Sequence, residues 1–214
     1  MDLTSKYQYF LLDLDGTLSD PGVGITNSVM YALKKYGIEV SDRSELYSFI
    51  GPPLKDSFMR FYGFSEEKAL EAVRFYREYF HDRGIFENEL YPETADCLKR
   101  LKAAGKTIIM ATSKPEEFAV RILKHFDIFE YFDYACGATM DETRNKKDEV
   151  IAYALKQAKV TGLTQAVMVG DREHDILGAI KNGIDSIGVL CGYGSREELE
   201  KAGADYIVNG LGDI

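Results

Sequence analysis

Two aspartates at the end of a short apolar run are the residues of this chain best suited to chemistry. Asp13 and Asp15 follow residues 9–12, a run too short for a helix and typical of a strand buried on both faces. Because side chains alternate along an extended chain, both carboxylates are expected to point the same way, with Leu14 turned aside. Gly16 then permits a sharp turn. Two carboxylates this close repel unless a cation lies between them, which predicts a site for Mg2+, a hard ion that prefers oxygen ligands.

A second acidic pair follows another strand-like run, residues 166–169. Asp171 would supply a further oxygen to the same ion, and Asp175, one helical turn later, could hold a metal-bound water or steady Lys147. Thr112 and Lys147 then offer a hydroxyl and a fixed positive charge to phosphate oxygens. Together these residues predict a Mg2+-dependent phosphoryl-transfer site. The expected metal ligands are Asp13, Asp15, Asp171 and Asp175.

In order and spacing, the four segments resemble the four motifs of the haloacid dehalogenase (HAD) superfamily. Those motifs are D-x-D-G-T, a strand-end Thr or Ser, a Lys, and G-D-x-x-x-D, and here they correspond to residues 13–17, Thr112, Lys147 and residues 170–175. The resemblance covers nearly the whole chain. It looks most like the phosphoglycolate phosphatase and 5'-nucleotidase branch, in which a cap is inserted between the first and second motifs. It implies a phosphatase with a Rossmann-like core.

The resemblance also implies roles for individual residues. Asp13 would attack phosphorus and form an aspartyl-phosphate, while Asp15 would give a proton to the leaving alcohol and later take one from the hydrolytic water. Mg2+ and Lys147 would offset the charge on the transferred group. Thr112 completes the expected catalytic set. Contacts with the substrate are expected from Gly16, Thr17, Ser113 and Lys114, and from Gly51 and Pro52 in a stiff loop of the cap.

Some of these positions also have simpler interpretations, which the residues alone leave open. Ser113 could cap the helix that Pro115 opens. Lys146 and Lys147 are adjacent, and a lysine at a helix start is more often solvated, although Lys147 matches the third motif better. Asp175 could be an ordinary first-turn carboxylate favoured by the helix dipole. The sequence therefore predicts the presence of a phosphoryl-transfer site more strongly than it predicts the role of any single residue in it.

The chain changes its pattern after about residue 84. Residues 20–84 are helical in pattern throughout, whereas the sequence beyond residue 92 alternates strands and helices. This alternation implies a parallel sheet covered on both faces, with ligands bound beyond the carboxyl ends of the strands. We therefore predict an α/β fold: a doubly wound parallel sheet formed by residues 1–19 and 85–214, with an inserted all-helical cap domain at residues 20–84.

Composition narrows the classes of partner and compartment. The 214 residues are 45% hydrophobic and 29% charged, which is ordinary for a globular protein. A net charge of -9 argues against a nucleic acid polymer or an anionic membrane as partner, since both need a basic surface. Cys97, Cys136 and Cys191 lie far apart, without the spacing of a disulfide framework or a zinc site. With no apolar stretch long enough for a signal or a membrane span, we expect a cytoplasmic protein.

The leading function is hydrolysis of a small phosphorylated metabolite, either phosphoglycolate or a nucleoside 5'-monophosphate. A phosphomutase of the β-phosphoglucomutase type would use the same two aspartates. A phospho-accepting regulatory protein would also combine an aspartate pocket with Thr, Lys and Mg2+, but the cap argues against it because a receiver is a single compact unit. A dehalogenase would need neither Asp15 nor a metal. The sequence does not distinguish a monomer from a homodimer, and it stops soon after Asn209, where related proteins continue into one more helix.

Overall fold

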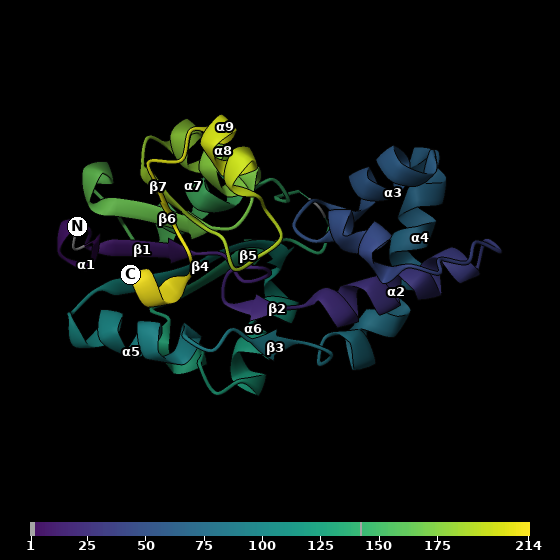
Figure 1. Ribbon diagram of the computed structural model, residues 1–214, viewed down its shortest axis with the longest axis horizontal. Coiled ribbons are helices and arrows are strands. Elements are labelled where there is room, and N and C mark those ends of the chain that lie inside the picture. The colour runs from purple at the N-terminus through teal and green to yellow at the C-terminus, as the bar shows by residue number, and fades with distance from the viewer. Residues whose placement is uncertain (1–2, 142) are drawn as a thin grey trace. The chain divides into compact units, whose positions relative to one another are not determined.

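The chain forms two compact units in the computed structural model, which describes residues 3–141 and 143–214 (Figure 1). The first unit consists of Met1–Ser19 and Leu90–Ile214, and the second is Asp20–Glu89. All four motifs predicted to carry chemistry fall in the first unit. The second unit is the segment inserted between the first and second motifs.

The first unit is built on a six-stranded sheet whose neighbouring strands all run parallel. The order is β5-β4-β1-β6-β7-β8, so the first strand lies inside the sheet and the chain order reverses beside it. Ligands bind to such sheets at the carboxyl edge, next to this reversal. The predicted doubly wound parallel sheet is confirmed. The strands are β1 Tyr9–Leu12, β4 Thr107–Pro115, β5 Tyr134–Ala138, β6 Ala166–Gly170, β7 Asp185–Val189 and β8 Tyr206–Val208.

Helices cover both faces of this sheet, as expected for its buried inner strands β1, β4 and β6. Figure 1 shows α7, α8 and α9 on one face and α5 and α6 on the other. Helices α6, α7, α8 and α9 each follow one strand of the sheet and return the chain to the start of the next, which keeps the carboxyl ends of the strands at one edge. The helices of the unit are α1 Leu3–Lys6, α5 Thr94–Ala103, α6 Glu116–His125, α7 Lys147–Gln157, α8 Glu173–Asn182 and α9 Arg196–Ala202.

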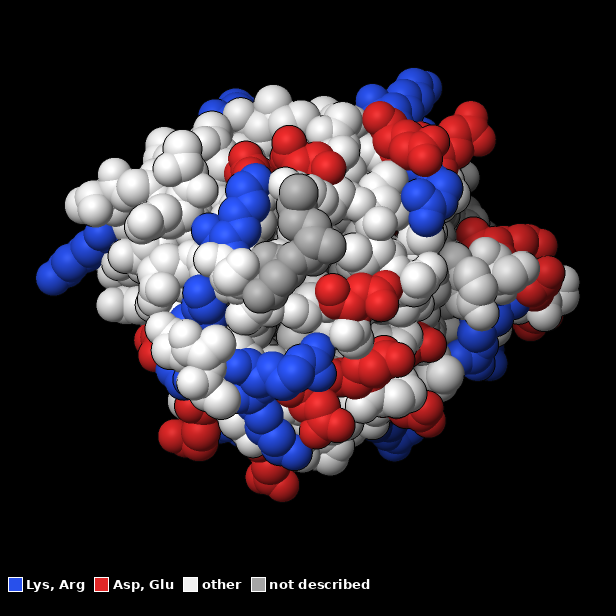
Figure 2. Space-filling model, turned by 60° about the vertical axis from the view of Figure 1, so that its left-hand side comes forward, with Lys and Arg blue, Asp and Glu red and all other residues white. Residues whose placement is uncertain are grey.

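The surface carries charges of both signs. On the face shown in Figure 2, Lys and Arg side chains lie among Asp and Glu side chains. A mixed face of this kind does not supply the broad positive field on which nucleic acid binding depends. Within the described part of the chain, no helix is both long enough and apolar enough to cross a membrane.

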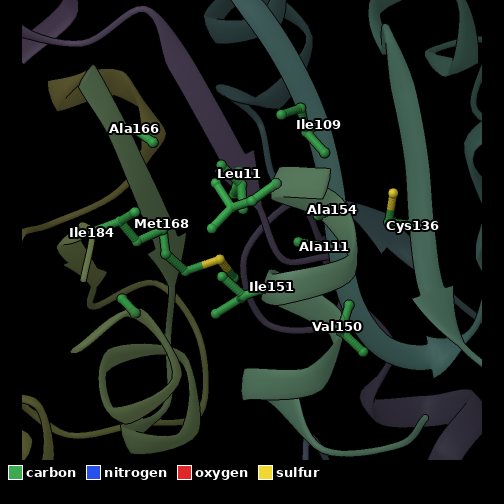
Figure 3. Packing of buried hydrophobic residues seen from close by; sticks show 12 residues of the cluster. Leu11, Ile109, Ala111, Cys136, Val150, Ile151, Ala154, Ala166, Met168 and Ile184 are labelled. Atoms are coloured by element: carbon green, nitrogen blue, oxygen red, sulfur yellow. The ribbon is translucent and has the colours of Figure 1, made fainter. Parts of the chain in front are cut away.

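A buried apolar cluster joins α7 and α8 to the middle of the sheet (Figure 3). Leu11 of β1 and Met168 of β6 lie against Ile151 of α7, and all three side chains are fully buried. Burying a side chain of this size stabilises the fold by about 1.5–3 kcal/mol. The packing fixes α7 on the sheet, and the first residue of α7 is Lys147.

The second unit packs its helices around aromatic side chains. The Phe58 ring is fully buried, and its centroid lies 5.1 Å from that of Phe49 and 6.0 Å from that of Phe64. These aromatic positions therefore serve the core of the unit. Its elements are α2 Gly22–Lys34, the 3-10 helix η1 Arg43–Phe49, α3 Leu54–Tyr62, α4 Glu66–Tyr79 and the π-helical turn η2 Phe80–Gly84. The short strands β2 Ser19–Asp20 and β3 Glu89–Leu90 pair with each other.

Residues 85–89 belong to the second unit, whereas the sequence pattern assigned them to the first. The backbone N–H of Gly24 donates to the carbonyl of Glu87 at 2.9 Å, and Ile85 is buried. Gly84 was expected to end the helical insertion. The chain beyond Gly84 is nevertheless tied to the start of α2, a long-range contact that no local pattern reveals.

Candidate active site

The residues of the predicted site lie at the carboxyl ends of three neighbouring strands. Asp13 directly follows β1, Thr112 lies in β4, and Asp171 directly follows β6. Because β1 pairs with both β4 and β6, these three ends meet at one edge of the sheet. Lys147 and Asp175 lie in the first turns of α7 and α8. The structure therefore brings residues from all four motifs together within one unit.

Lys147 is buried between two carboxylates. Its Nζ lies 2.8 Å from Asp13 Oδ1 and 2.9 Å from Asp175 Oδ1, and it donates to the carbonyl of Ala111 at 3.2 Å. Burial by itself would lower the pKa of Lys147, but the charges of Asp13 and Asp175 outweigh it and raise this pKa. The lysine is thus a fixed positive charge. The neighbouring Lys146 is exposed at the N-cap of α7.

Three carboxylates converge beside this lysine. Asp13, Asp171 and Asp175 are buried, and one oxygen from each lies within 4.8 Å of the others. Burial, together with the neighbouring carboxylates, raises the pKa of Asp171 to about 8. Burial also raises the pKa of Asp175 to about 6, although Lys147 opposes the change. The three carboxylates therefore repel one another when ionised, and a cation would relieve that repulsion.

The donor set fits a hard divalent cation. Asp175 Oδ1 is buried and receives no well-directed hydrogen bond within the described residues, although Lys147 Nζ is close enough for an ion pair. A buried carboxylate oxygen with a lone pair left over is a natural metal ligand. The set contains only carboxylate oxygens, which favours Mg2+ over a softer transition metal.

Asp15 does not join the acidic cluster. Lys114 Nζ donates to both of its carboxylate oxygens, at 2.7 and 2.6 Å, and both side chains are almost fully buried. Burial raises the pKa of Asp15, and the charge and hydrogen bonds of Lys114 oppose the rise. The expectation that the side chains of Asp13 and Asp15 bind one ion side by side therefore does not match this arrangement.

The reason is that the chain leaves the extended conformation earlier than the pattern suggested. Strand β1 ends at Leu12, and the carbonyl of Leu14 accepts hydrogen bonds from the N–H groups of Leu18 and Ser19, at 2.9 and 3.1 Å. Gly16 completes the turn with a φ of 81°, in the left-handed region that favours glycine. Side-chain alternation applies only along a strand, so it cannot be extended from Asp13 through this turn.

Thr112 shapes the turn that presents Lys114. The Thr112 hydroxyl is buried and accepts a hydrogen bond from the backbone N–H of Lys114 at 3.2 Å, where the register of β4 against β5 shifts. Ser113 is half-buried in β4 and does not cap α6, whose N-cap is Pro115 and has no side-chain hydrogen bond. The capping interpretation of Ser113 is therefore wrong.

The remaining predicted substrate contacts are divided between the two units. Gly16 and Thr17 lie in the turn after Asp13, and the Thr17 hydroxyl donates to Asp171 Oδ1 at 3.4 Å. Gly51 and Pro52 lie in the second unit, between η1 and α3, and Gly51 has a φ of 102°. Contact of Gly51 and Pro52 with a substrate stays a prediction.

The sequence did not reveal two of the contacts that hold the site. One is the ion pair of Lys114 with Asp15, which needs the turn after Thr112 to be known. The other is the backbone N–H of Tyr193, which donates to Asp171 Oδ2 at 2.7 Å. The only local signal for the second contact is the pair of glycines at 192 and 194, which leave room for the backbone to approach Asp171 closely.

Comparison with known proteins agrees with this geometry. A family model described as haloacid dehalogenase-like hydrolase matches residues 10–189, a range that contains all four motifs. A 5'-nucleotidase of Pseudomonas aeruginosa is 44% identical over 198 residues, which cover 92% of this chain and 89% of that protein. The tyrosine-protein kinase PtkA of Mycobacterium tuberculosis is 37% identical over 202 residues, covering 94% of this chain and 68% of that protein.

A solved structure is also similar over almost the whole chain. The crystal structure of a predicted phosphatase from Clostridium acetobutylicum is 48% identical, has a TM-score of 0.94 and covers 97% of this chain and 95% of its own. Both compact units therefore have counterparts in that protein. The likeness extends across the four motifs and the inserted segment together.

Proposed function

Because this chain belongs to the haloacid dehalogenase-like hydrolase family and is an enzyme of its phosphatase type, we propose that it hydrolyses a small phosphomonoester with Mg2+ through an aspartyl-phosphate. The observation that carries the proposal is the buried cluster of Asp13, Asp171 and Asp175 beside Lys147. A nucleoside 5'-monophosphate is the favoured substrate, since the 44% identical relative is named a 5'-nucleotidase. Phosphoglycolate is the alternative.

Asp13 is the proposed nucleophile. Its Oδ1 lies 2.8 Å from Lys147 Nζ and accepts the backbone N–H of Leu14 at 2.8 Å, so attack by Oδ2 leaves both contacts in place. A bond forms between Oδ2 and phosphorus as the bond from phosphorus to the ester oxygen breaks. Lys147 stabilises the negative charge that spreads over the phosphoryl oxygens.

Asp15 is the proposed general acid and base. In the first step its carboxyl proton passes to the leaving alcohol oxygen. In the second step Asp15 takes a proton from water as the water oxygen attacks phosphorus, and the bond to Asp13 breaks. The products are the alcohol and inorganic phosphate, and both aspartates return to their starting state. The ion pair with Lys114 places Asp15 at this edge of the sheet.

The carboxylates of Asp13, Asp171 and Asp175 would hold the cation, and the side chain of Asp15 is not among them. A bound Mg2+ would supply charge neutralisation and orientation for the phosphoryl group. Thr112 and Ser113 stay proposed contributors to phosphate binding, as do Gly16 and Thr17 from the turn after β1. We also propose that the enzyme works in the cytoplasm, because its three cysteines are all free.

The first test measures phosphate release from nucleoside 5'-monophosphates, phosphoglycolate and sugar phosphates, with Mg2+ and with EDTA. We expect release from one substrate class that EDTA abolishes. The Asp13→Asn variant is expected to stay folded and lose turnover, whereas Asp96→Asn, at an exposed position of α5, keeps it. Activity in Asp13→Asn would contradict the covalent mechanism. Transfer to a second hydroxyl instead of water would favour a phosphomutase, and a stable phosphoprotein would favour a regulatory role.

A further inference from the structure

We propose that the loop at residues 191–194, between β7 and α9, is a positioning element that sets the orientation of the Asp171 carboxylate for cation binding. The inference rests on the proposed Mg2+-dependent function. This loop belongs to none of the four motifs and contributes no side chain to the acidic cluster among the described residues. It acts on Asp171 through its backbone.

A hydrogen bond from the loop distinguishes the two oxygens of Asp171. The backbone N–H of Tyr193 donates to Oδ2 at 2.7 Å, whereas Oδ1 accepts a longer hydrogen bond, from the Thr17 hydroxyl at 3.4 Å. Asp171 is fully buried, so solvent does not compete for either oxygen. A short hydrogen bond to a charged group is among the stronger ones in proteins. Oδ2 is thereby fixed, and Oδ1 is the oxygen left for a cation.

The loop can approach this closely only because it has no side chain at two positions. A Cβ at residue 192 would lie 2.3 Å from Asp171 Oδ2 and 2.2 Å from the carbonyl oxygen of Gly16. A Cβ at residue 194 would lie 1.9 Å from the backbone carbonyl oxygen of Asp171. Neither Gly192 nor Gly194 has a positive φ, so space rather than backbone conformation explains both glycines.

Gly16 also lies directly against this carboxylate. A Cβ there would lie 2.2 Å from Asp171 Oδ2. The Asp171 carboxylate thus packs against both the turn that follows Asp13 and the loop at residues 191–194. Any displacement of the loop changes the position of Asp171 relative to Asp13, and these are two of the three clustered carboxylates.

The loop is anchored at both ends. Leu190 donates its backbone N–H to the carbonyl of Val208 at 3.0 Å, which ties the loop to β8. At the other end, Glu198 of α9 pairs with Arg172 at 2.8 Å and accepts the backbone N–H of Glu173 at 2.9 Å. These last contacts lie on the two residues directly after Asp171. These contacts therefore hold the loop and Asp171 in a fixed arrangement.

The test compares Mg2+ binding to the substrate-free enzyme, measured by calorimetric titration with MgCl2 alone, in wild type and in Gly192→Ala. We expect binding to weaken by about tenfold or more, the usual cost of losing a group that orients a metal ligand. The matched control is Gly84→Ala in η2 of the second unit, which contains none of the clustered carboxylates; a Cβ there would meet Ser28 Oγ at 2.5 Å. We expect this variant to lose thermal stability and to keep its Mg2+ affinity within about twofold of wild type.

Equal Mg2+ binding by wild type and Gly192→Ala would overturn the inference, and so would an equal loss in Gly84→Ala. If Gly192→Ala fails to fold, the second variant is Glu198→Gln, which weakens the contacts of Glu198 with Arg172 and Glu173 without adding volume. Unchanged Mg2+ affinity in that variant would overturn the inference. A wild-type protein that binds no Mg2+ would instead refute the proposed function. The two failures are therefore distinguishable in one experiment.

Discussion

The buried ion pair between Lys114 and Asp15 determines how the proposed general acid is held. Burial raises the pKa of Asp15, and Lys114 is the largest opposing influence. In Lys114→Met this opposition is lost, so Asp15 keeps its proton to higher pH. If the proton donor sets the alkaline limb of the kcat/KM profile, that limb is expected to move to higher pH in the variant.

The measurement is a pH profile of kcat/KM in wild type, Lys114→Met and Lys146→Met. Lys146 is exposed, so its variant changes the net charge equally without touching Asp15. An alkaline limb that stays in place in Lys114→Met, or that moves equally in the control, would count against Asp15 as the proton donor.

Replacing Lys147 is expected to lower both the folding stability and the turnover of the enzyme. Lys147→Met leaves the carboxylates of Asp13 and Asp175 buried without their cation. Breaking a buried ion pair in this way typically costs about 3–5 kcal/mol of folding free energy. Turnover is expected to fall by at least about 100-fold, because a fixed charge at the transferred group is lost. Thermal unfolding in EDTA checks the loss of stability, and a kinetic assay checks the loss of turnover. If Lys147→Met kept wild-type turnover and Lys146→Met were inactive, Lys146 and not Lys147 would be the active lysine.

At the scale of elements, the contact between α7 and α8 sets where Lys147 and Asp175 stand relative to each other. Gly178 lies at this contact: a Cβ there would be 2.9 Å from Ile151 Cδ1 and 3.1 Å from Lys147 Cγ. Replacing glycine by alanine within a helix usually stabilises it by about 1 kcal/mol. Here we expect Gly178→Ala to destabilise the fold by about 1–3 kcal/mol through overpacking and to lower kcat. Calorimetric unfolding measures whether Gly178→Ala raises or lowers the stability of the fold. A gain in stability would show that α7 can shift to accommodate the added methyl group without cost.

The elements also show what the sequence could and could not predict. Apolar runs ending at Leu12 and Val169 gave the buried strands, and the parallel arrangement followed from the alternation of strands and helices. The acidic cluster followed because strand ends meet at one edge. The position of Asp15 did not follow, since it depends on hydrogen bonds to the Leu14 carbonyl that end the strand early. The hydrogen bond from Tyr193 to Asp171 did not follow either, because the glycines at 192 and 194 do not indicate which backbone N–H donates or which carboxylate accepts.

At the scale of the whole molecule, the acidic cluster links folding stability to pH and to metal. Burial and the neighbouring carboxylates raise the pKa of Asp171 to about 8, and burial raises that of Asp175 to about 6 despite Lys147. In the unfolded chain an aspartate has its ordinary pKa of about 4. Between these values the folded protein holds more protons than the unfolded one, so its stability falls as pH rises. A bound cation favours the ionised carboxylates and has the opposite dependence.

We therefore expect the midpoint of thermal unfolding in EDTA to decrease between about pH 5 and pH 8, the window set by these raised pKa values. Saturating Mg2+ should raise the midpoint, and by more at pH 8 than at pH 5, because the cation competes with fewer protons at the higher pH. Asp171→Asn removes a carboxyl whose pKa is raised to about 8, so its midpoint in EDTA should depend less on pH, and Mg2+ should raise it less. A wild-type midpoint in EDTA that rises with pH across this window would mean that the buried carboxylates are already neutralised by groups of the protein, and the cluster would then have no need of a metal.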